Sequence, residues 1–420
     1  MALTRFNGRL TAASLAAASA GLSIALISLA KVLLVLTALM VLLRGRQVPG
    51  EDAPLEKMWT PRLVLVILFA FACSLLWTSA PMSQALGAMG KYGKFLVIPA
   101  LLMLIRTRRE AVWVLAVFLT AQIFLLMSSW LLYFDIPLVW ATSREAKTSH
   151  AVFSSYLDQS IMSAVVAAIF WHLRTEAPNR AVFYAAIAVS LLALGSVFVV
   201  FTGRTGHLVG TAMVSLAIFW ALLRRYRLAS LLVPPLIFLL SFLFFDKVAQ
   251  RFSAVKTEVS AYSVQPESVT SSGVRLSFWK TSVEAILEKP LAGTGVGSWA
   301  TEYNKIEHLK NPAHKYLDVG SNPHQEFLIW GVQLGVGGIM LLLAFICAGM
   351  LDLRKMDTPI VLAGMSVLVA LAISCLFNSS LYDAHIGDFF CLSLGVLLVY
   401  GFHSREASQG GETAGVVKHQ

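Results

Sequence analysis

Long apolar runs separated by short polar segments dominate the chain. A helix needs about 20 apolar residues to cross the hydrocarbon core of a bilayer, and runs of this kind recur throughout the sequence after residue 59. The pattern predicts an all-α polytopic membrane protein. The predicted spans cover residues 60–78, 83–105, 111–134, 151–173, 181–200, 205–223, 228–245, 324–350, 359–378 and 386–402.

The apolar run from Leu10 to Leu43 is interrupted only by Lys31. As one helix it would be about 50 Å long, which is too long for a single crossing. We interpret it as two short helices with Lys31 near their turn. The pattern as a whole therefore predicts about 12 transmembrane helices.

Composition supports a membrane protein and excludes other classes. The chain is 57% hydrophobic and 13% charged, whereas soluble domains are about 25% charged. A cytosolic enzyme, a secreted disulfide scaffold and a disordered protein are excluded. The four cysteines lie inside apolar runs, where thiols serve as small packing groups. The net charge of +10 comes with no basic tract interleaved with aromatics, so we expect no nucleic-acid partner.

Lysine and arginine mark the cytoplasmic loops of membrane proteins. Twelve spans with both termini in the cytoplasm place the cationic loops on that side, whereas eleven spans would leave Arg5 and Arg9 outside. The sequence thus predicts a multi-pass protein with cytoplasmic termini. The loops in question contain Arg5, Arg9, Arg44, Arg46, Lys57, Arg106, Arg108, Arg109, Arg174, Arg180, Arg224, Arg225, Arg227, Arg354 and Lys355.

This topology divides the chain into four segments. Residues 1–245 hold the first nine transmembrane helices, residues 246–322 form a large outer loop, residues 323–402 hold the last three helices, and residues 403–420 form a cytoplasmic tail. The outer loop is too long to be a simple connector. Helical periodicity predicts helices over residues 274–288 and 298–309, so we expect a small folded cap.

Two arginines lie on the predicted outer side, although arginine is usually enriched in cytoplasmic loops. Arg204 lies in the short segment Thr202–His207, where it could snorkel to lipid headgroups or bind a phosphate bidentately. Arg275 could form a weak surface ion pair. It shares its loop with the glycine turn Gly293–Gly297, whose backbone amides could turn toward an anion.

His324 is the candidate general base. Asn322 can cap a helix and Pro323 suits its first position, so His324 would lie at the positive end of that helix. This position disfavours imidazolium and keeps the ring able to accept a proton near pH 7. The alternative is a histidine that only fills the interface.

A charged side chain within a membrane span costs free energy, so its presence suggests a functional role. Lys91 and Lys94 lie on one predicted span and Asp158 lies at a similar depth on another. They could form a structural ion pair, or the lysines could line a groove for a lipid-linked phosphate.

Asp383, His385 and Asp388 form the only acidic and imidazole cluster on the outer side. Their spacing matches no metal motif, so we expect a wall of the site and neither a metal nor a cofactor.

Together these motifs resemble the O-antigen ligase superfamily, which includes the lipopolysaccharide O-antigen ligase. The resemblance rests on Arg204 in Gly-Arg-Thr-Gly, Arg275 four residues before Trp279, the glycine turn, and His324 with the apolar, glycine-containing segment after it. It is concentrated between residues 202 and 337. Gln325 departs from the family, which commonly has Asn after the histidine, but it keeps the amide.

The resemblance implies a GT-C-like, metal-independent, inverting glycosyltransferase of the bacterial inner membrane. Its donor would be a glycan on undecaprenyl pyrophosphate, its acceptor a sugar hydroxyl of lipid A–core, and its surroundings membrane lipids, with the active site facing the periplasm. His324 is similar to the family histidine that activates the acceptor. Arg204 and Arg275 are similar to arginines that hold the pyrophosphate.

Three alternatives remain open. An O-antigen polymerase or a protein O-oligosaccharyltransferase would use the same donor with similar residues. A transporter of lipid-linked glycans would carry interrupted helices in corresponding places of two halves, whereas here the polar residues crowd the outer face.

Overall fold

The computed structural model describes residues 8–44, 54–244, 250, 253, 271–313 and 321–416, and these residues form helices and no strands. Seven of the helices are long and apolar enough to cross a membrane, which confirms an all-α polytopic membrane protein. They are α2 (Ile24–Leu43), the run Met82–Leu104 made of α5 (Met82–Tyr92), η1 (Gly93–Leu96) and α6 (Val97–Leu104), α7 (Arg108–Tyr133), the run Arg180–Val200 made of α10 (Arg180–Gly195) and the π-helical η3 (Ser196–Val200), α16 (Glu326–Leu353), α17 (Thr358–Phe377) and α18 (Ala384–Val416).

Every other predicted span also coincides with a helix, although these helices are shorter or less apolar. They are α1 (Gly8–Ser19), α4 (Trp59–Ser74), α9 (Tyr156–Leu173), α11 (Arg204–Ala221) and α12 (Val233–Phe244). Short helical turns fill several connections: α3 (Pro54–Lys57), α8 (Ala146–Ser149), η2 (Arg174–Glu176) and η4 (Arg224–Leu232). The last helix, α18, continues beyond the predicted end of its span at residue 402.

The first apolar run divides into two helices, but not at Lys31. Gly21 adopts a left-handed conformation with φ of 79° between α1 and α2, and Ser23 caps α2. Lys31 lies inside α2, so its predicted place near the turn was wrong. Its ammonium bonds the buried carboxylate of Asp388 on α18 at 2.7 Å, and this ion pair makes a lysine tolerable within the bundle.

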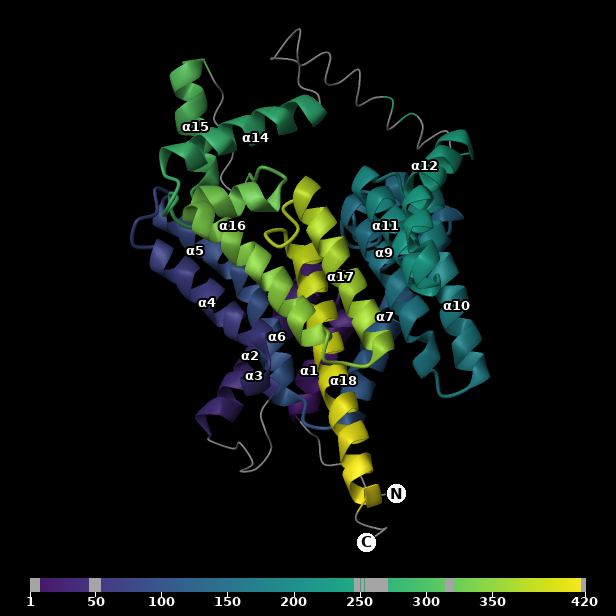
Figure 1. Cartoon of the computed structure of the whole chain (residues 1–420). Helices are drawn as coiled ribbons and strands as arrows, with labels where there is room; N and C mark the ends of the chain where they lie inside the picture. The colour runs from purple at the N-terminus through teal and green to yellow at the C-terminus, as the bar shows by residue number, and fades with distance from the viewer. Residues whose placement is uncertain are drawn as a thin grey trace.

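Helix α18 forms the centre of the bundle (Figure 1). Its residues from Ile386 to Tyr400 are buried throughout, because α6, α7 and α17 pack along it. By contrast, α2 and α10 present exposed apolar side chains such as Leu29 and Leu191, as helices at a lipid boundary would. The core thus contains a helix that carries polar residues, and the periphery is apolar.

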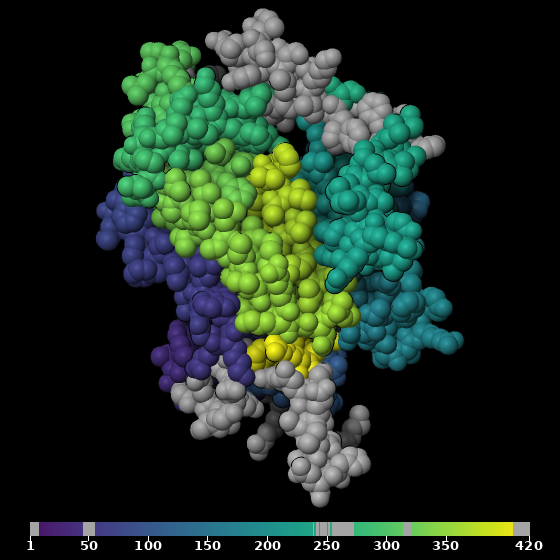
Figure 2. Space-filling view, in the orientation of Figure 1, coloured from purple at the N-terminus to yellow at the C-terminus, as the bar shows by residue number. Residues whose placement is uncertain are grey.

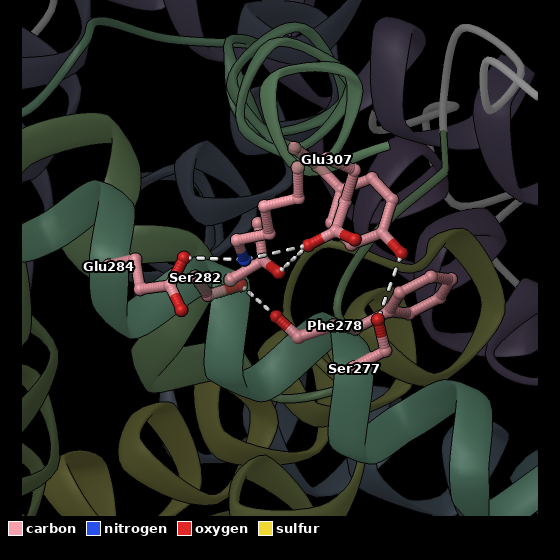
Figure 3. A network of polar contacts seen from close by, with 8 residues as sticks. Ser277, Phe278, Ser282, Glu284 and Glu307 are labelled. Carbon is pink, nitrogen blue, oxygen red and sulfur yellow. Dashed lines mark hydrogen bonds and ion pairs between the residues drawn. The ribbon is translucent and has the colours of Figure 1, made fainter. Parts of the chain in front are cut away.

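Helices α14 (Ser271–Glu288) and α15 (Trp299–Lys310) confirm the two helices predicted in the large loop. Aromatic rings of Phe278, Trp299 and Tyr303 stack between them, with centroids 5.0 to 5.2 Å apart. Polar contacts along the same seam join Lys310 to Glu284 at 2.6 Å, Lys310 and Thr281 to Glu307, and Ser277 to Tyr303 (Figure 3). The two helices therefore form one unit.

This pair lies over the end of α16, on the side of α4 and α5 and across the bundle from α11 and α12 (Figure 2). The opposite end of the molecule carries cations from separate predicted cytoplasmic segments. Lys57, Lys355 and Arg405 line one cavity of about 320 Å³ there, and Arg9 pairs with Glu110 at 3.8 Å. Several of the predicted cytoplasmic segments thus lie near one another. The side of the membrane that they face stays a prediction.

Candidate functional site

The glycine turn joins the outer helices to the bundle. Gly293, Gly295 and Gly297 have φ of 63°, 88° and 80°, a region that side chains disfavour. A Cβ on Gly295 would lie 2.3 Å from the Cα of Thr78, so the close approach of two backbones requires glycine. The turn is therefore fixed by packing against the α4–α5 connection.

The amides of this turn bond the protein itself, which contradicts their predicted use for an anion. Thr294 N and Gly295 N donate to the carbonyls of residues 332 and 333 at 2.8 and 2.9 Å, and Gly297 N donates to Gln333 Oε1 at 3.1 Å. Val296 N donates to Ser74 Oγ at 3.0 Å.

The carbonyls of residues 332 and 333 are available because α16 is interrupted at Gly335, where φ is 65° and ψ is −156°. Sequence patterns showed the glycines but not this break in α16, so an anion site was inferred where the structure has a helix-to-turn junction.

His324 is held in a rare backbone conformation. Its φ is 52°, which costs free energy for a residue with a side chain and is kept only where neighbours fix it. Asn322 Oδ1 accepts the His324 amide at 2.9 Å, and Trp279 Nε1 of α14 donates to Pro323 O at 3.0 Å. Gln325 N donates to Ser379 Oγ at 3.1 Å. Contacts from three directions therefore orient the histidine.

The helix after His324 begins later than predicted. Gln325, not Asn322, is the N-cap of α16, and its side chain accepts Leu328 N at 2.6 Å. His324 consequently lies before the helix rather than in its first turn. The prediction was wrong because Asn322 bonds His324 and Asp383 instead of the helix start.

The structure brings Arg275 and His324 together. Burial lowers the pKa of His324, and the positive charge of Arg275 lowers it further. Both effects disfavour imidazolium. The ring therefore remains neutral at pH 7, beside a guanidinium on α14.

Asp383 joins the same cluster through Asn322. Asn322 Nδ2 donates to Asp383 Oδ1 at 3.2 Å, and Lys94 Nζ donates to the carbonyl of Asp383. Burial raises the pKa of Asp383, while the charges of Lys94 and Lys91 oppose this rise. Asp383, Asn322 and the backbone of His324 thus form a continuous chain of hydrogen bonds.

Glu326 holds the α17–α18 connection in place and was missed in the sequence. Its fully buried carboxylate accepts the amides of Leu381 at 2.8 Å and Tyr382 at 3.2 Å, and the indole of Trp330 at 2.7 Å. The sequence signal was an acidic residue directly before a long apolar run, because burying a carboxylate at the start of a membrane helix costs free energy.

The remaining lysine and aspartate take separate places. Lys91 Nζ lies 3.9 Å from the ring centroid of Tyr382, next to Asp383. Asp158 lies in the first turn of α9. Within the described segments no ion pair links Lys91 to Asp158, so the structural pair considered from the sequence is not formed.

Of the predicted acidic and imidazole cluster, only Asp383 is placed with His324. Asp388 bonds Lys31 through both carboxylate oxygens at 2.7 Å, deeper in the bundle. His385 is buried on the first turn of α18. Lys31 therefore engages the carboxylate of Asp388, and the role of these two residues as a wall of the site stays a prediction.

Arg204 begins α11, which packs on α9 and α17. A Cβ on Gly206 would lie 2.0 Å from Ser160 Oγ, and one on Gly203 would lie 2.8 Å from it. The glycines around Arg204 therefore allow α11 to approach α9, rather than serving a ligand. This approach places Arg204 beside the helical turn that contains Asp158.

A cavity of about 220 Å³ opens next to these groups. Lys91 and Tyr382 line one side, and Gln84, Trp299 and Gln333 contribute from α5, α15 and α16. Tyr382 and Ser321, which precede Asp383 and Asn322 in the chain, thus connect the hydrogen-bonded cluster to a space that a polar ligand can enter.

Part of the chain is similar to a known protein family. Residues 190–343 match the family model described as O-antigen ligase, and no curated protein matches the chain. The matched segment includes Arg204, Arg275, the glycine turn and His324. The resemblance stated from these motifs is thereby confirmed.

Proposed function

We propose that this chain, a member of the O-antigen ligase superfamily by its residues 190–343, is a glycosyltransferase that transfers O-antigen from undecaprenyl pyrophosphate to a sugar hydroxyl of lipid A–core. The observation that carries the proposal is the placement of His324, held in a fixed conformation, beside Arg275. A neutral base next to a phosphate-binding cation is what transfer from a pyrophosphate requires.

His324 acts as the general base. A base must be neutral to accept the proton of the acceptor hydroxyl, and burial together with Arg275 favours that form. The deprotonated oxygen then attacks the anomeric carbon of the donor sugar, and the bond between that carbon and the pyrophosphate oxygen breaks. One direct displacement of this kind inverts the anomeric configuration.

Arg275 and Arg204 bind the pyrophosphate. The leaving group departs with negative charge, and guanidinium groups match phosphate oxygens bidentately. Preorganised donors of this type stabilise developing charge. Arg275 lies on α14 and Arg204 on α11, so the pyrophosphate would bridge the outer helices and the bundle.

Asp383, Lys94 and Lys91 organise the floor of the site. Asp383 orients His324 through Asn322, and Lys94 holds the backbone of Asp383. The Lys91 ammonium lies over Tyr382 at the edge of the cavity, where it can contact a phosphate of either lipid-linked substrate, the donor or the acceptor. Asp158 lies between Leu157 and Ser160, the α9 residues that pack against Gly203 and Gly206, and we assign it the role of orienting Arg204.

The topology follows from the same proposal. The end that carries Arg275 and His324 faces the periplasm, and the end that carries Lys57, Lys355 and Arg405 faces the cytoplasm. Residues 246–322 form the periplasmic part of the active site, between membrane helices in 1–245 and 323–402, and residues 403–420 extend into the cytoplasm. We propose the bacterial inner membrane as its location.

Reconstitution tests the reaction directly. Purified protein in lipid vesicles would receive undecaprenyl-pyrophosphate-linked glycan and lipid A–core, with and without a chelator. We expect release of undecaprenyl pyrophosphate and a glycan-bearing lipid A–core in both samples. No release of undecaprenyl pyrophosphate with any acceptor would contradict transfer and favour the transporter alternative.

A gene deletion separates the ligase from related transferases. A ligase mutant should lose all O-antigen from its core and accumulate the lipid-linked polymer. A polymerase mutant would leave one repeat on the core, and loss of a protein O-oligosaccharyltransferase would leave lipopolysaccharide intact. Either of those last two results on a lipopolysaccharide gel would overturn lipid A–core as the acceptor.

A further inference from the structure

A second, larger hollow continues outward from the cavity beside Tyr382. It measures about 740 Å³ and lies between the α4–α5 connection and α15. Gln84 lines both this hollow and the inner cavity of about 220 Å³. The two spaces therefore adjoin at Gln84, and we name them together the α5–α15 groove.

The groove is lined by hydroxyl and amide groups more than by charge. Three of the lining side chains form no hydrogen bond with another described residue, so their donors and acceptors are available to a ligand. They are Ser83, Gln84 and Thr301. Asn304 and His308 lie on the same face of α15. Groups that both donate and accept suit the many hydroxyls of a saccharide.

Gly87 on α5 lies where an added side chain would occupy the inner cavity. A Cβ built there would have no neighbour within 4 Å, so packing does not require glycine at this helical position. Glycine weakens a helix, yet Gly87 lines the inner cavity. A side chain at residue 87 would extend into that cavity.

We propose that the α5–α15 groove binds the oligosaccharide of the acceptor and presents its sugar hydroxyl to His324. This inference rests on the proposed transferase function. Arg204 lies on α11, across the bundle from α5 and α15 (Figure 1). A donor held by Arg204 and Arg275 therefore enters from the α11 side, and the groove remains for the acceptor.

The sharpest test replaces Gly87 with leucine and uses Gly90→Leu as the matched control. Both glycines lie on α5 with nothing within 4 Å of the added Cβ, but only Gly87 lines the groove. Both variants should fold, because leucine favours a helix more than glycine does. We expect Gly87→Leu to raise the KM for lipid A–core about tenfold or more, with the donor KM unchanged, and Gly90→Leu to behave as the parent protein.

A milder change tests the polar lining. Gln84→Ala removes one amide, and loss of one hydrogen bond to a ligand should raise the acceptor KM about three- to tenfold. Leu86→Ala, on the same helix and outside the groove, is its control. Equal acceptor KM values for Gly87→Leu and Gly90→Leu, or an increase confined to the donor KM, would overturn the proposal.

A binding measurement separates this proposal from the proposed reaction. Core oligosaccharide freed from lipid A would be titrated against the protein in detergent, followed by saturation-transfer NMR. Binding that Gly87→Leu abolishes and Gly90→Leu retains supports the groove even if the parent protein transfers no glycan. Normal transfer together with unchanged oligosaccharide binding in Gly87→Leu would overturn the groove and leave the transferase function standing.

Discussion

Two groups of buried charges in this protein use the same residue types differently. Deep in the bundle, Lys31 and Asp388 meet at 2.7 Å and neutralise each other. Near the end covered by α14 and α15, Lys91 lies over an aromatic ring and Lys94 bonds a backbone carbonyl, next to Asp383 and His324. In the first arrangement each charge has an opposite charge as its partner. In the second, Lys91 lines a cavity instead of pairing with a carboxylate.

The difference shows how to separate chemistry from stability in a membrane protein. A buried charged group that forms an ion pair with a group of opposite sign is compensated by that partner, so it requires no ligand. A charged group whose partners are aromatic rings or backbone carbonyls keeps its net charge. That charge can attract a substrate group of opposite sign. Substitutions in the group near His324 should therefore lower activity, whereas substitutions in the Lys31–Asp388 pair should lower stability.

The largest expected effect comes from His324→Ala. Removing a general base should lower the rate of glycan transfer by about 10²–10⁴. The measurement is the initial rate in lipid vesicles, with the melting temperature of each preparation as a check on folding. A folded His324→Ala protein with near-parent activity would show that another group accepts the proton.

Breaking the ion pair should act on stability instead. Asp388→Ala leaves the partly buried Lys31 without its carboxylate, and because Lys31 is not fully buried the loss should be about 3 kcal/mol, the lower end of the range for buried pairs. The double change Lys31→Met with Asp388→Leu removes both charges and should recover most of that loss. Chemical denaturation in detergent measures it, and equal stability of all three proteins would contradict a structural role.

Arg275→Ala should reduce the transfer rate by about 10²–10³, because one electrostatic donor to the leaving pyrophosphate is lost. Arg204→Ala should fall in the same range. Arg144→Ala is the matched control, since Arg144 is exposed in the segment between the predicted spans 111–134 and 151–173. A loss as large in Arg144→Ala would indicate a general surface-charge effect rather than binding of pyrophosphate.

The smallest effect is a shift in pH dependence. Activity should require neutral His324 and fall as pH drops through its pKa, which burial and Arg275 hold below the ordinary value of about 6.5. Removing the cation raises that pKa, so the residual activity of Arg275→Ala should have its acidic midpoint at higher pH than the parent protein. The rate profile from pH 5 to 8 measures this, and an unchanged midpoint would disconnect Arg275 from His324.

Much of the fold was readable from the chain. Every predicted span coincides with a helix, and both helices of the large loop occur where periodicity placed them. Two local predictions failed for the same reason. Lys31 was placed at a turn and Asn322 at a helix cap, but Asp388 and Asp383, distant in sequence, determine what those residues contact.

The candidate site divides in a similar way. His324, Arg275, Arg204, Asp383 and the lysines could be named from residue type and position, and the matched family segment contains the first three. The role of Glu326 and the true use of the glycine turn could not be named. Both depend on backbone amides and carbonyls whose partners are known only after α16 and its break at Gly335 are placed.

By itself the sequence determined that this is a helical membrane protein with cations collected at one end and a few reactive residues near the other. Apolar length and charge sign act locally, so a linear pattern records them. Only the tertiary structure decided which buried charges pair, which glycines pack, and that Arg275 approaches His324. Those outcomes depend on distances between helices far apart in the chain, and such distances arise only from packing.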